Sequence, residues 1–585
     1  MIVSVSGSRD GSTPYQHQQV KLFIKTYHEY IEELHHGQCK GFDEEVHDLA
    51  MEHSIKIVIH PPTKQKYLSD RKSEIMLPPK EYLERNKDLS QVCHLLIAAP
   101  STEEEVMRSG TWSTIRYARK KGKKIWIIPP ERKEMDSGDS LETVLNAVRA
   151  KRNILLHGPG GVGKSWLFKK IIERLSQHSI NVCATALTGV AALNLNVPDL
   201  PITATTLHRF SGIKTGNKSV EGLINMVNSD RRARNRIRKC DVLIIDEISM
   251  LGSSLFHKLN EVFKSVREDD TIFGGIQLIA GGDFLQLPPV KDDWVFNTEE
   301  WDELDLRPFI LEVPHRYTDV DFFKLLLRVR LAEHTKDDVK VLKKRVKSHR
   351  KLLDTLKELE GKNPAEVIKP TVFFPKKAQA EAYNHDELVK LTTPVKTFTS
   401  SDEITSKKGK HLLRDYQFLL EENIPEIIEL KEGAQVMLKI NMDTDLGLVN
   451  GSRGVITNIV DGEAVNVTFI NGVESRIERH NFEFENKEVS VVRTQIPLVL
   501  AYAMTIHKSQ SASMDYIVAD LGPDIFSHGQ SYVGLSRCSD VKGLFISEFH
   551  PEKITADEEA KEYNDTIRRK SDLEDIKVIV ESVMG

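Results

Sequence analysis

The residues whose chemistry is easiest to interpret lie between positions 154 and 165. An apolar segment, Ile154–His157, runs directly into Gly158-x-x-x-x-Gly163-Lys164-Ser165. Glycines let a loop wrap with its backbone N–H groups pointing at phosphate oxygens, a lysine at this spacing reaches the β- and γ-phosphates, and a serine hydroxyl binds Mg²⁺. A helix predicted after the loop adds the positive end of its dipole. The pattern predicts a nucleoside triphosphate site formed by Gly158, Gly160, Gly161, Gly163, Lys164 and Ser165.

A second pattern supplies the carboxylates that hydrolysis needs. Residues 241–245 are mostly apolar and lead into Asp246 and Glu247. At the carboxyl end of a strand beside the phosphate loop, Asp246 would hold Mg²⁺ together with Ser165, and Glu247 would orient and deprotonate the attacking water. The two patterns together predict magnesium-dependent hydrolysis of a nucleoside triphosphate.

Length and composition limit the class of protein. A chain of 585 residues is too long for one core, so about three or four domains are expected. Its content of 40% hydrophobic and 29% charged residues is typical of a soluble globular protein. No apolar run approaches the roughly eighteen residues of a membrane span, and the N-terminus lacks the basic segment and cleavage site of a signal peptide. We therefore expect no membrane partner.

Cysteine use and charge narrow the expected surroundings further. The five cysteines are scattered, with no Cys/His cluster of the zinc-binding kind. Free thiols of this kind indicate an intracellular, reducing compartment, either cytoplasm or nucleus. The net charge of −5 argues against a uniformly basic nucleic-acid-binding surface. A local basic groove is still compatible with it, because phosphate contacts depend on where the charges lie.

Changes of pattern along the chain indicate an α/β protein of several domains. Residues 1–130 alternate strands, at 2–6, 55–60, 94–99 and 124–128, with helical stretches, which predicts a Rossmann-like parallel sheet with helices on both faces. The polar stretch 131–140 is the predicted linker to a second α/β block. Short strands with glycine turns predict a small β-barrel within 426–490, and the charged residues 551–585 predict a C-terminal helical tail.

Further motifs accompany the first two, and the whole set stands in a fixed order along the chain. They are residues 185–192 (TALTGVAA), 206–210 (TLHRF), 282–290 (GDFLQLPPV), 315–317 (HRY), 430–454, 503–510 (AMTIHKSQ) and 532–537 (YVGLSR). The ordered set resembles the RecD/Pif branch of superfamily 1B DNA helicases. The resemblance implies an ATP- and Mg²⁺-dependent motor that moves 5′ to 3′ on single-stranded DNA and unwinds duplex. Single-stranded and forked DNA would be its partners, and DNA replication, repair and recombination its processes.

The same resemblance implies a division of the chain into motor lobes. The first RecA-like lobe, 1A, would span 141–310, with a small 1B insertion near 203–238. The second, 2A, would comprise 311–425 and 491–550, and the β-rich stretch 426–490 would be an SH3-like 2B insertion. Closure of the two lobes around ATP is what such a motor requires.

Resemblance also assigns roles to residues outside the phosphate loop. Gln286 would sense the γ-phosphate, and Arg316 and Arg537 would reach across the cleft between the lobes to stabilise transition-state charge. For each arginine, a surface salt bridge is the alternative, and Arg316 stands in His-Arg-Tyr where the family usually has Phe-Arg-Gln. The implied catalytic set is Lys164, Asp246, Glu247, Gln286, Arg316 and Arg537.

Contacts with DNA would come from small polar groups at loop tips, mostly to the backbone. The residues that match the family's strand-contacting motifs are Thr188, Thr206, His208, Thr505, His507 and Lys508. His208 is equally compatible with a polar residue satisfied inside its own loop. The basic run 231–239 would either contact phosphates near a fork or form the solvated face of a helix.

Two departures from the family pattern affect these predictions. The stretch 140–149, shortly before the phosphate loop, lacks the glutamine that reads the adenine edge, so preference for ATP over other nucleotides is less secure. Ser511 replaces the glycine of the usual Lys-Ser-Gln-Gly, which narrows the backbone angles available to that loop.

The N-terminal domain resembles a different group, the SLOG superfamily related to DNA-processing protein A and the LOG phosphoribohydrolases. The resemblance rests on short glycine-rich motifs at strand ends, including residues 5–9, 36–43 and 110–114. It implies a nucleotide-derived ligand bound by Gly7, Ser8, Arg9, Gly37, Gly41, Asp43, Gly110 and Thr111. Asp43 would bind a ribose or cap its helix. The catalytic glutamate of the LOG pattern is missing, which favours binding over hydrolysis.

Two functions stay open on the sequence. The first is the DNA motor, which Gln286, Arg316 and Arg537 favour. The alternative is a ligand-gated, DNA-bound ATPase switch in a signalling or defence pathway, in which the N-terminal domain senses a nucleotide.

Overall fold

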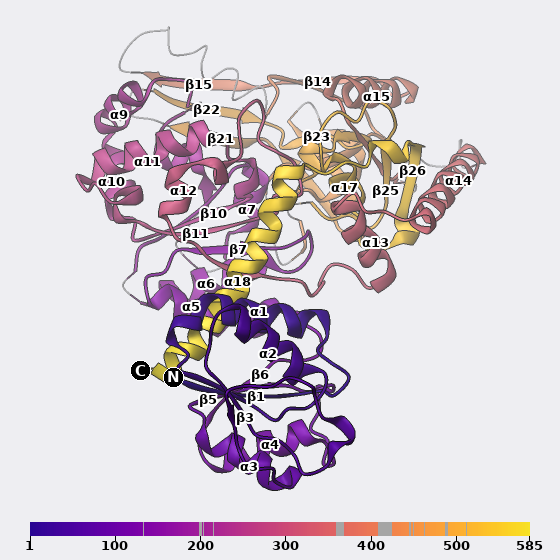
Figure 1. Cartoon of the computed structure of the whole chain (residues 1–585). Coiled ribbons are helices and arrows are strands. Elements are labelled where there is room, and N and C mark those ends of the chain that lie inside the picture. Colours follow the sequence, from indigo (N-terminus) through magenta and orange to yellow (C-terminus); the bar gives the residue numbers. More distant parts are fainter. Residues whose placement is uncertain are drawn as a thin grey trace. The chain divides into compact units, whose positions relative to one another are not determined.

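The computed structural model describes the chain except for residues 133, 179, 198–199, 201, 203, 215, 359–367, 407–423, 441, 444–445, 449, 461–462, 486–488, 511 and 585. It contains two compact units (Figure 1). The first comprises 1–134 and 566–585, and the second comprises 135–565. Both are built around parallel sheets with helices between the strands, so the predicted α/β class is confirmed. In the described part of the chain, no helix combines the length and the apolar character needed to cross a bilayer.

The first unit contains one six-stranded parallel sheet of order β4-β3-β2-β1-β5-β6. Its strands are β1 (Ile2–Gly7), β2 (Glu33–His36), β3 (Ile57–Ile59), β4 (Ile75–Met76), β5 (Leu95–Ala99) and β6 (Lys124–Ile127). Its helices are α1 (Pro14–Tyr27), α2 (Phe42–Glu52), α3 (Tyr82–Val92) and α4 (Gly110–Lys120). The strand order reverses at β1, so the carboxyl ends of β1 and β5 flank a topological switch point, where open α/β sheets bind ligands.

Helix α18, Glu558–Met584, takes part in both units, which corrects the prediction of a charged tail. Ile576 and Val580 are 1% and 2% exposed and pack in the apolar core of the first unit with Phe23 and Ile24. Residues of α18 up to Asp565 belong to the second unit. The C-terminal segment is therefore a structural part of the protein.

The first sheet of the second unit carries the phosphate loop. Its order is β12-β7-β11-β10-β8-β9, all parallel. The strands are β7 (Ile154–His157), β8 (Val182–Ala186), β9 (Thr205–Thr206), β10 (Val242–Asp246), β11 (Gln277–Gly282) and β12 (Arg307–Ile310). Since all run the same way, the residues after β7, β10 and β11 meet at one edge of the sheet.

Helices surround this sheet and differ in part from the predicted boundaries. They are α5 (Ser137–Arg149), α6 (Lys164–Ser176), α7 (Gly189–Asn194), α8 (Leu207–Ser211), α9 (Val220–Ser229), α10 (Arg231–Lys239), α11 (Ser253–Arg267) and α12 (Glu299–Glu303). Residues 137–140, predicted as linker, open α5, because the Asp136 side chain caps the helix by accepting from the Gly138 N–H at 2.7 Å. The predicted 1B range is mainly helical, from α8 to α10.

A second parallel sheet, of order β24-β13-β25-β26, lies in the region predicted as the second motor lobe. Its strands are β13 (Thr371–Phe374), β24 (Ala503–Thr505), β25 (Ile517–Leu521) and β26 (Leu544–Phe549). Its helices are α13 (Val320–Arg330), α14 (Lys336–Glu358), α15 (Lys377–Lys390) and α17 (Gln530–Leu535). Helix α13 packs against α17, and α14 packs against β26.

Antiparallel strands fill the middle of the second unit's sequence. A five-stranded sheet contains β17 (Gln435–Leu438), β18 (Arg453–Val460), β19 (Ala464–Phe469), β20 (Glu474–Glu478) and β23 (Leu498–Leu500). Two smaller sheets pair β14 (Lys396–Thr399) with β16 (Ile427–Leu430), and β22 (Val489–Gln495) with β15 (Ser401–Ser406) and β21 (His480–Glu485). These strands extend on both sides of the predicted range 426–490. The turn predicted at 461–462 lies outside the described residues.

Candidate nucleotide and nucleic-acid sites

The phosphate loop connects β7 to α6 in a conformation that depends on glycine. Gly163 caps α6 with φ +88°, in the left-handed region that favours glycine. A side chain at Gly158 would overlap the backbone carbonyl of Leu311, the residue that follows β12. The loop is therefore held closely between neighbouring elements, with α6 beginning at the phosphate-binding lysine.

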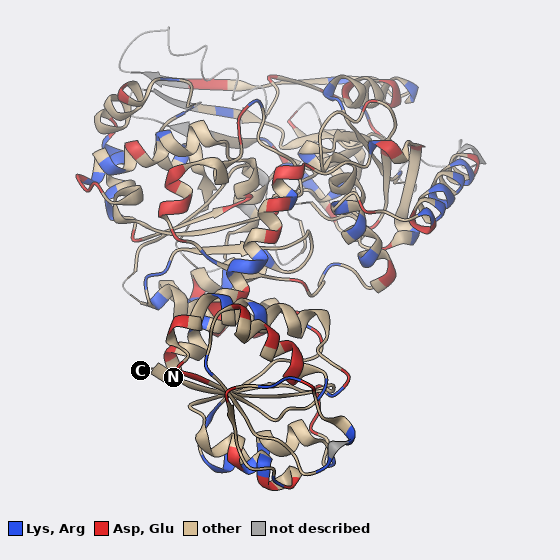
Figure 2. Ribbon diagram, in the orientation of Figure 1, with Lys and Arg blue, Asp and Glu red and all other residues tan. Residues whose placement is uncertain are grey.

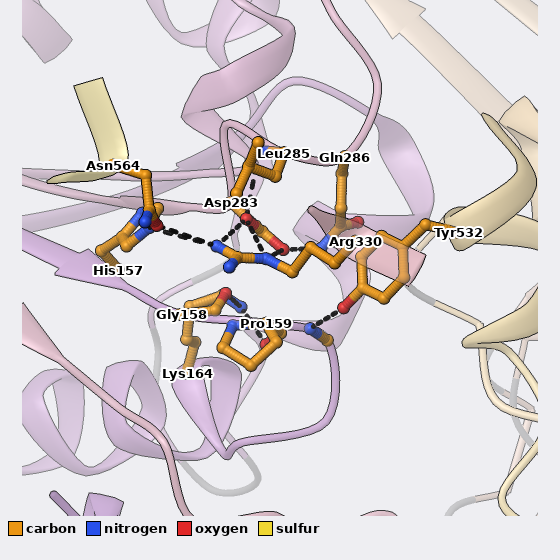
Figure 3. Close-up of polar contacts among 11 residues, drawn as sticks. His157, Gly158, Pro159, Lys164, Asp283, Leu285, Gln286, Arg330, Tyr532 and Asn564 are labelled. Carbon is orange, nitrogen blue, oxygen red and sulfur yellow. Dashed lines mark hydrogen bonds and ion pairs between the residues drawn. The ribbon is translucent and has the colours of Figure 1, made fainter. Parts of the chain in front are cut away.

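The Lys164 side chain folds back onto the phosphate loop. Its ammonium donates to the carbonyl oxygens of Gly158 at 2.7 Å and Pro159 at 2.8 Å (Figure 3). Burial lowers the pKa of Lys164. A buried ammonium with only carbonyl partners favours an anionic ligand, because a phosphate oxygen would offset the cost of burying the charge.

Ser165 and Asp246 converge as expected for a magnesium site. The Ser165 hydroxyl donates to Asp246 Oδ2 at 3.3 Å, and Asp246 is 4% exposed. Burial, with repulsion from Glu247, raises the pKa of Asp246 to about 7. Among the described residues, no three or more His, Cys, Asp or Glu side chains are grouped to hold a metal. One hydroxyl and one carboxylate fit Mg²⁺, which usually takes one or two protein oxygens and completes its shell with phosphates and water.

Glu247 sits directly beyond β10 in a left-handed backbone conformation, with φ +57°. Gln510, from the segment after β24, donates from its side-chain amide to Glu247 Oε2 at 3.0 Å. The predicted general base is therefore oriented by a residue of the second sheet. Gln510 belongs to the motif 503–510, but the sequence alone did not predict a role for it.

Gln286 lies in a buried network beside the loop (Figure 3). Its side-chain amide donates to Asp283 Oδ2 at 3.3 Å, and its Oε1 has no hydrogen-bond partner among the described atoms. Asp283 is fully buried and paired with Arg330, whose Nη2 lies 2.6 Å from Oδ1. Gly529 fits against the Gln286 carbonyl, where any side chain would overlap it. Gln286, the predicted γ-phosphate sensor, is thus held on one side by an ion pair and on the other by the start of α17.

The same network reaches the root of the phosphate loop. His157, the last residue of β7, has its Nε2 3.0 Å from Asn564 Oδ1 and 3.3 Å from Arg330 Nη2. Arg330 also donates to Asn564 Oδ1 at 3.3 Å. Burial and the nearby Arg330 lower the pKa of His157 to about 4, so its ring is neutral and donates to Asn564. No motif in the sequence identified Arg330 or Asn564 as site residues.

Two predicted arginines meet at the tip of the phosphate loop. A Cβ placed on Gly160 would lie 3.2 Å from Arg537 Nη2 and 3.7 Å from Arg316 Nη1. Arg316 donates to the Ser536 carbonyl at 2.9 Å. Arg537 is 2% exposed, and burial together with Arg316 lowers its pKa to about 10. The surface salt-bridge alternative therefore does not describe Arg537.

Tyr532 is a further loop contact that the sequence did not single out. Its hydroxyl accepts the Gly160 N–H at 3.0 Å (Figure 3). It belongs to α17, one turn before Arg537, and burial raises its pKa. The N–H group that it occupies is one that a phosphate loop normally directs at its ligand.

The predicted DNA-contacting residues form two groups at strand ends. Thr188 follows β8, and Thr206 ends the neighbouring parallel strand β9 and caps α8 by accepting from the Arg209 N–H at 3.3 Å. Thr505, at the end of β24, likewise accepts from the Lys508 N–H at 3.2 Å. The three hydroxyls therefore shape local turns and keep their own protons free to donate.

The remaining predicted DNA contacts differ in exposure. Lys508 is exposed, whereas burial lowers the pKa of both His208 and His507. The His507 ring stacks on Phe526, with centroids 5.7 Å apart and planes 12° from parallel, and Phe526 is 64% exposed. An exposed aromatic ring thus accompanies the second group. Ser511 lies outside the described residues.

The basic run 231–239 forms α10, and three of its five arginines are engaged within the fold. Arg234 donates to the Asn228 carbonyl at 2.9 Å, and Arg236 to the Arg209 carbonyl at 2.7 Å. Arg238 donates to the Val266 carbonyl at 2.8 Å and pairs with Glu268. These contacts favour the structural interpretation of the run over a phosphate contact.

In the first unit, most of the predicted ligand residues gather at the switch point. Thr111, at the start of α4, donates to the Gly7 carbonyl at 2.9 Å, and the Ser8 N–H donates to the Ala99 carbonyl at 3.1 Å. Gly41 caps α2 at φ +82° beside the Arg9 backbone. Gly110 opens α4 at the same edge, with open space where a Cβ would be.

Asp43 takes a role that neither sequence alternative described. Its Oδ2 accepts the N–H groups of Gly37 and Cys39, each at 3.1 Å, so it holds the loop after β2. The cap of α2 is Gly41, not Asp43. Burial raises the pKa of Asp43 to about 6, which leaves it charged at neutral pH beside Arg85.

Aromatic rings frame the exposed Arg9. Its guanidinium carbon lies 4.6 Å from the Tyr67 ring centroid and 5.2 Å from that of Tyr82. Arg85 lies 5.5 Å from the Tyr82 centroid and donates to the Gly37 carbonyl at 2.7 Å. The carboxyl edge of the first unit's sheet thus combines cationic and aromatic groups.

Comparisons with known proteins match the second unit. The PIF1-like helicase family matches residues 136–364, and the 2B domain of DNA helicase Pif1 matches 420–459. The ATP-dependent DNA helicase PIF1 of Xenopus laevis is 36% identical over 442 residues, covering 74% of this chain and 64% of the frog protein. This chain therefore spans less than two thirds of that relative.

Solved structures of Pif1 helicases have a similar fold. The crystal structure of Pif1 helicase from Candida albicans superposes on 73% of this chain and 99% of its own, with a TM-score of 0.62 and 29% identity. The structure of Bacteroides Pif1 bound to single-stranded DNA covers 74% of this chain and 97% of its own, with a TM-score of 0.50 and 25% identity.

Proposed function

Because the chain belongs to the PIF1-like helicase family, we propose that it is an ATP-driven DNA helicase that moves 5′ to 3′ on single-stranded DNA. One observation carries the proposal. Arg316, Arg537 and Tyr532 converge on Gly160 of the phosphate loop, and Arg537 and Tyr532 follow strands of the second sheet. The environment of a nucleotide held in the loop would therefore change when the second lobe moves, as a motor requires.

Each residue of the cleft has a part in hydrolysis. Lys164 and the loop N–H groups bind the phosphates, and Ser165 and Asp246 would hold Mg²⁺, which would supply neutralisation of the phosphate charge. Glu247, held by Gln510, orients the attacking water and takes its proton. Gln286 Oε1, free of internal partners, is placed to accept from that water or to report the γ-phosphate. Arg316 and Arg537 stabilise the charge that develops as the bond breaks.

The proposed nucleic-acid partners are single-stranded and forked DNA. The frog relative is named a DNA helicase, and the Bacteroides relative was solved with single-stranded DNA. In this chain, the strand-end hydroxyls of Thr188, Thr206 and Thr505 and the exposed Lys508 offer backbone contacts. The exposed Phe526, stacked on His507, offers a surface for a base. A helicase with these partners would take part in DNA replication, repair and recombination.

A strand-separation assay tests the motor proposal. Wild type and Lys164→Ala are compared on duplexes with a 5′ tail or a 3′ tail, together with ATP hydrolysis with and without single-stranded DNA. We expect unwinding of the 5′-tailed substrate alone, hydrolysis stimulated by DNA, and loss of both in Lys164→Ala without loss of fold. Hydrolysis that is indifferent to DNA in a folded protein would refute the proposal.

A second proposal concerns the first unit, which we infer binds a nucleotide-derived ligand. Arg9 between Tyr67 and Tyr82, beside the N-terminus of α4 at the switch point, is the supporting observation. An aromatic ring can stack on a base, and Arg9 with the α4 backbone can bind phosphate. If such a ligand controls hydrolysis, the protein is a ligand-gated ATPase switch on DNA.

Binding to the full-length chain tests this second proposal. Nucleoside mono-, di- and triphosphates and dinucleotides are screened by thermal shift with Lys164→Ala as the background, so that the motor site contributes less. A stabilising ligand whose effect disappears in Arg9→Ala or Tyr82→Ala is expected. Equal stabilisation of wild type and both variants would place the ligand elsewhere.

A further inference from the structure

Most of helix α14, Lys336–Glu358, carries positive charge alone. From Val339 to Leu353 it contains seven Lys or Arg residues and no Asp or Glu, in a protein whose net charge is −5. Figure 2 shows the Lys and Arg residues following one another along this helix. No motif used in the proposed function includes this segment.

The basic residues occupy one face of the helix. On the opposite face, Leu342 is fully buried and Val346 and Leu352 pack against apolar clusters. The exposed members recur every three or four residues and are Lys340, Lys343, Lys344, Lys347, Arg350 and Lys351. We call these six residues the α14 basic row. Eleven helical rises from Lys340 to Lys351 place its ends about 16 Å apart.

An ordinary solvated helix face does not explain the row. Such faces carry alternating signs, as in α15, where Lys377 lies 3.5 Å from Glu381 one turn away. In the row, like charges face each other at that spacing, for example Lys343 and Lys347, which destabilises a helix. Lys340 pairs with Asp337 at 2.9 Å, and the other five make no ion pair within the described part of the chain.

This arrangement differs from that of the other basic helix. In α10, Arg234, Arg236 and Arg238 donate to backbone carbonyls of neighbouring segments. Among the described side chains of α14, Arg345 alone does so, donating to the Val541 carbonyl at 3.0 Å, and it lies outside the row. Apart from Lys340, the row is therefore a cationic surface that the described part of the fold leaves unneutralised.

The row lies at a different part of the lobe from the predicted single-strand contacts. Helix α14 packs against β26, whereas Thr505 ends β24, and these two strands form opposite edges of the four-stranded sheet. Three strand spacings separate the edges by about 14 Å. A nucleic acid on the row would thus be a different segment from the strand at Thr505.

We propose that the α14 basic row binds the phosphate backbone of the duplex part of a forked DNA. The proposal rests on the proposed helicase function. A straight row of cations about 16 Å long fits the regular backbone of a duplex, which neutralises charge without reading sequence. It would hold the duplex to the second lobe while the single strand passes the strand ends.

The salt dependence of binding tests the proposal. A variant with Lys343→Gln, Lys344→Gln, Lys347→Gln and Lys351→Gln keeps good helix formers at exposed positions. The control replaces four exposed lysines of the first unit by Gln, namely Lys21, Lys25, Lys120 and Lys121. Dissociation constants are measured for forked, blunt duplex and single-stranded DNA over a range of NaCl concentrations.

We expect the slope of log K against log salt to fall by about 3 to 4 for forked and duplex DNA, since each lost phosphate contact contributes about 0.9. Single-strand affinity and DNA-stimulated hydrolysis should stay within about twofold. The control should match wild type, and a variant with Lys→Arg at the same four positions should retain the slope. Melting curves confirm that each variant folds.

An unchanged slope on duplex, or an equal loss on single-stranded DNA, would overturn the assignment of the row to duplex. Failure of the helicase proposal looks different. In that case wild type itself would show no DNA-stimulated hydrolysis, whatever the row binds.

Discussion

The buried ion pair between Asp283 and Arg330 offers the sharpest test of how the cleft is held. The two side chains are 0% and 4% exposed, and Arg330 donates through both Nε and Nη2. Burial raises the pKa of Asp283, but the ion pair outweighs burial and holds the pKa below its usual range. Arg330→Met keeps most of the side-chain volume and leaves a buried carboxylate without its cation.

The expected cost follows from that uncompensated charge. Breaking a buried pair by removing one partner costs about 3–5 kcal/mol, whereas replacing both partners with neutral groups is often close to neutral. Arg330→Met should therefore destabilise the second unit by about that amount. The double variant Asp283→Asn/Arg330→Met should recover most of it, because the Asn carbonyl still accepts from the Leu285 N–H.

The pH dependence of this loss has a definite sign. Without Arg330, burial raises the pKa of Asp283 above its unfolded value. A raised carboxyl pKa contributes stability at low pH that is lost as the pH rises through it. The deficit of Arg330→Met against wild type should be larger at pH 8 than at pH 5, as urea unfolding would measure.

Catalysis separates a positioning role from a purely structural one. In the double variant, Gln286 has lost the charged anchor that orients it, so kcat for hydrolysis should fall at least about tenfold while KM for ATP changes less than about threefold. A double variant with wild-type stability and wild-type kcat would refute the positioning argument. A single variant within about 1 kcal/mol of wild type would refute the electrostatic one.

Three further perturbations follow from the structure. Asp246→Asn should abolish hydrolysis yet raise stability above pH 7 without Mg²⁺, since a carboxyl whose pKa is raised to about 7 loses stability as the pH rises through that value; melting at pH 6 and 8 checks this. Tyr532→Phe removes the acceptor that occupies the Gly160 N–H, so fluorescent nucleotide should bind up to about tenfold tighter, and weaker binding would contradict this. Ile576→Ala should cost the first unit about 2–5 kcal/mol in unfolding experiments, whereas the control Val578→Ala, at a 52% exposed position, should be nearly neutral.

The parts of the site that the sequence predicted are those encoded locally. The phosphate loop is eight consecutive residues, and Asp246 with Glu247 ends a run of apolar residues, so spacing alone identifies them. Parallel strands then place them at one edge without further information. The strands of the N-terminal sheet were found where they are apolar. Strand β2, Glu33–His36, was missed because two of its buried residues are histidines, which pair with His60 and His47.

The parts that were not predicted depend on contacts between distant residues. Gln510 reaches Glu247 across 263 positions, and Tyr532 reaches Gly160 across 372. Both lie in quoted motifs, yet only the packing of the two sheets assigns them their partners. The predicted bounds of the β-rich region, 426–490, were too narrow for a similar reason. Strands β14 and β15 pair with strands that come much later in the chain, and no turn signal links them.

Helix α18 explains why a charged segment can be a structural one. Its buried residues follow a regular helical spacing: Ala560, Asn564, Ile567, Ser571, Asp572, Ile576 and Val580. Three of these are polar, so a search for an apolar stripe finds no face to bury. Asn564 is buried because His157 and Arg330 satisfy its oxygen, and Asp572 lies 4.0 Å from Arg132. Burial of such residues is decided by partners far away in the sequence. These partners tie the start of the helix to the network beside the phosphate loop and its end to the first unit's core.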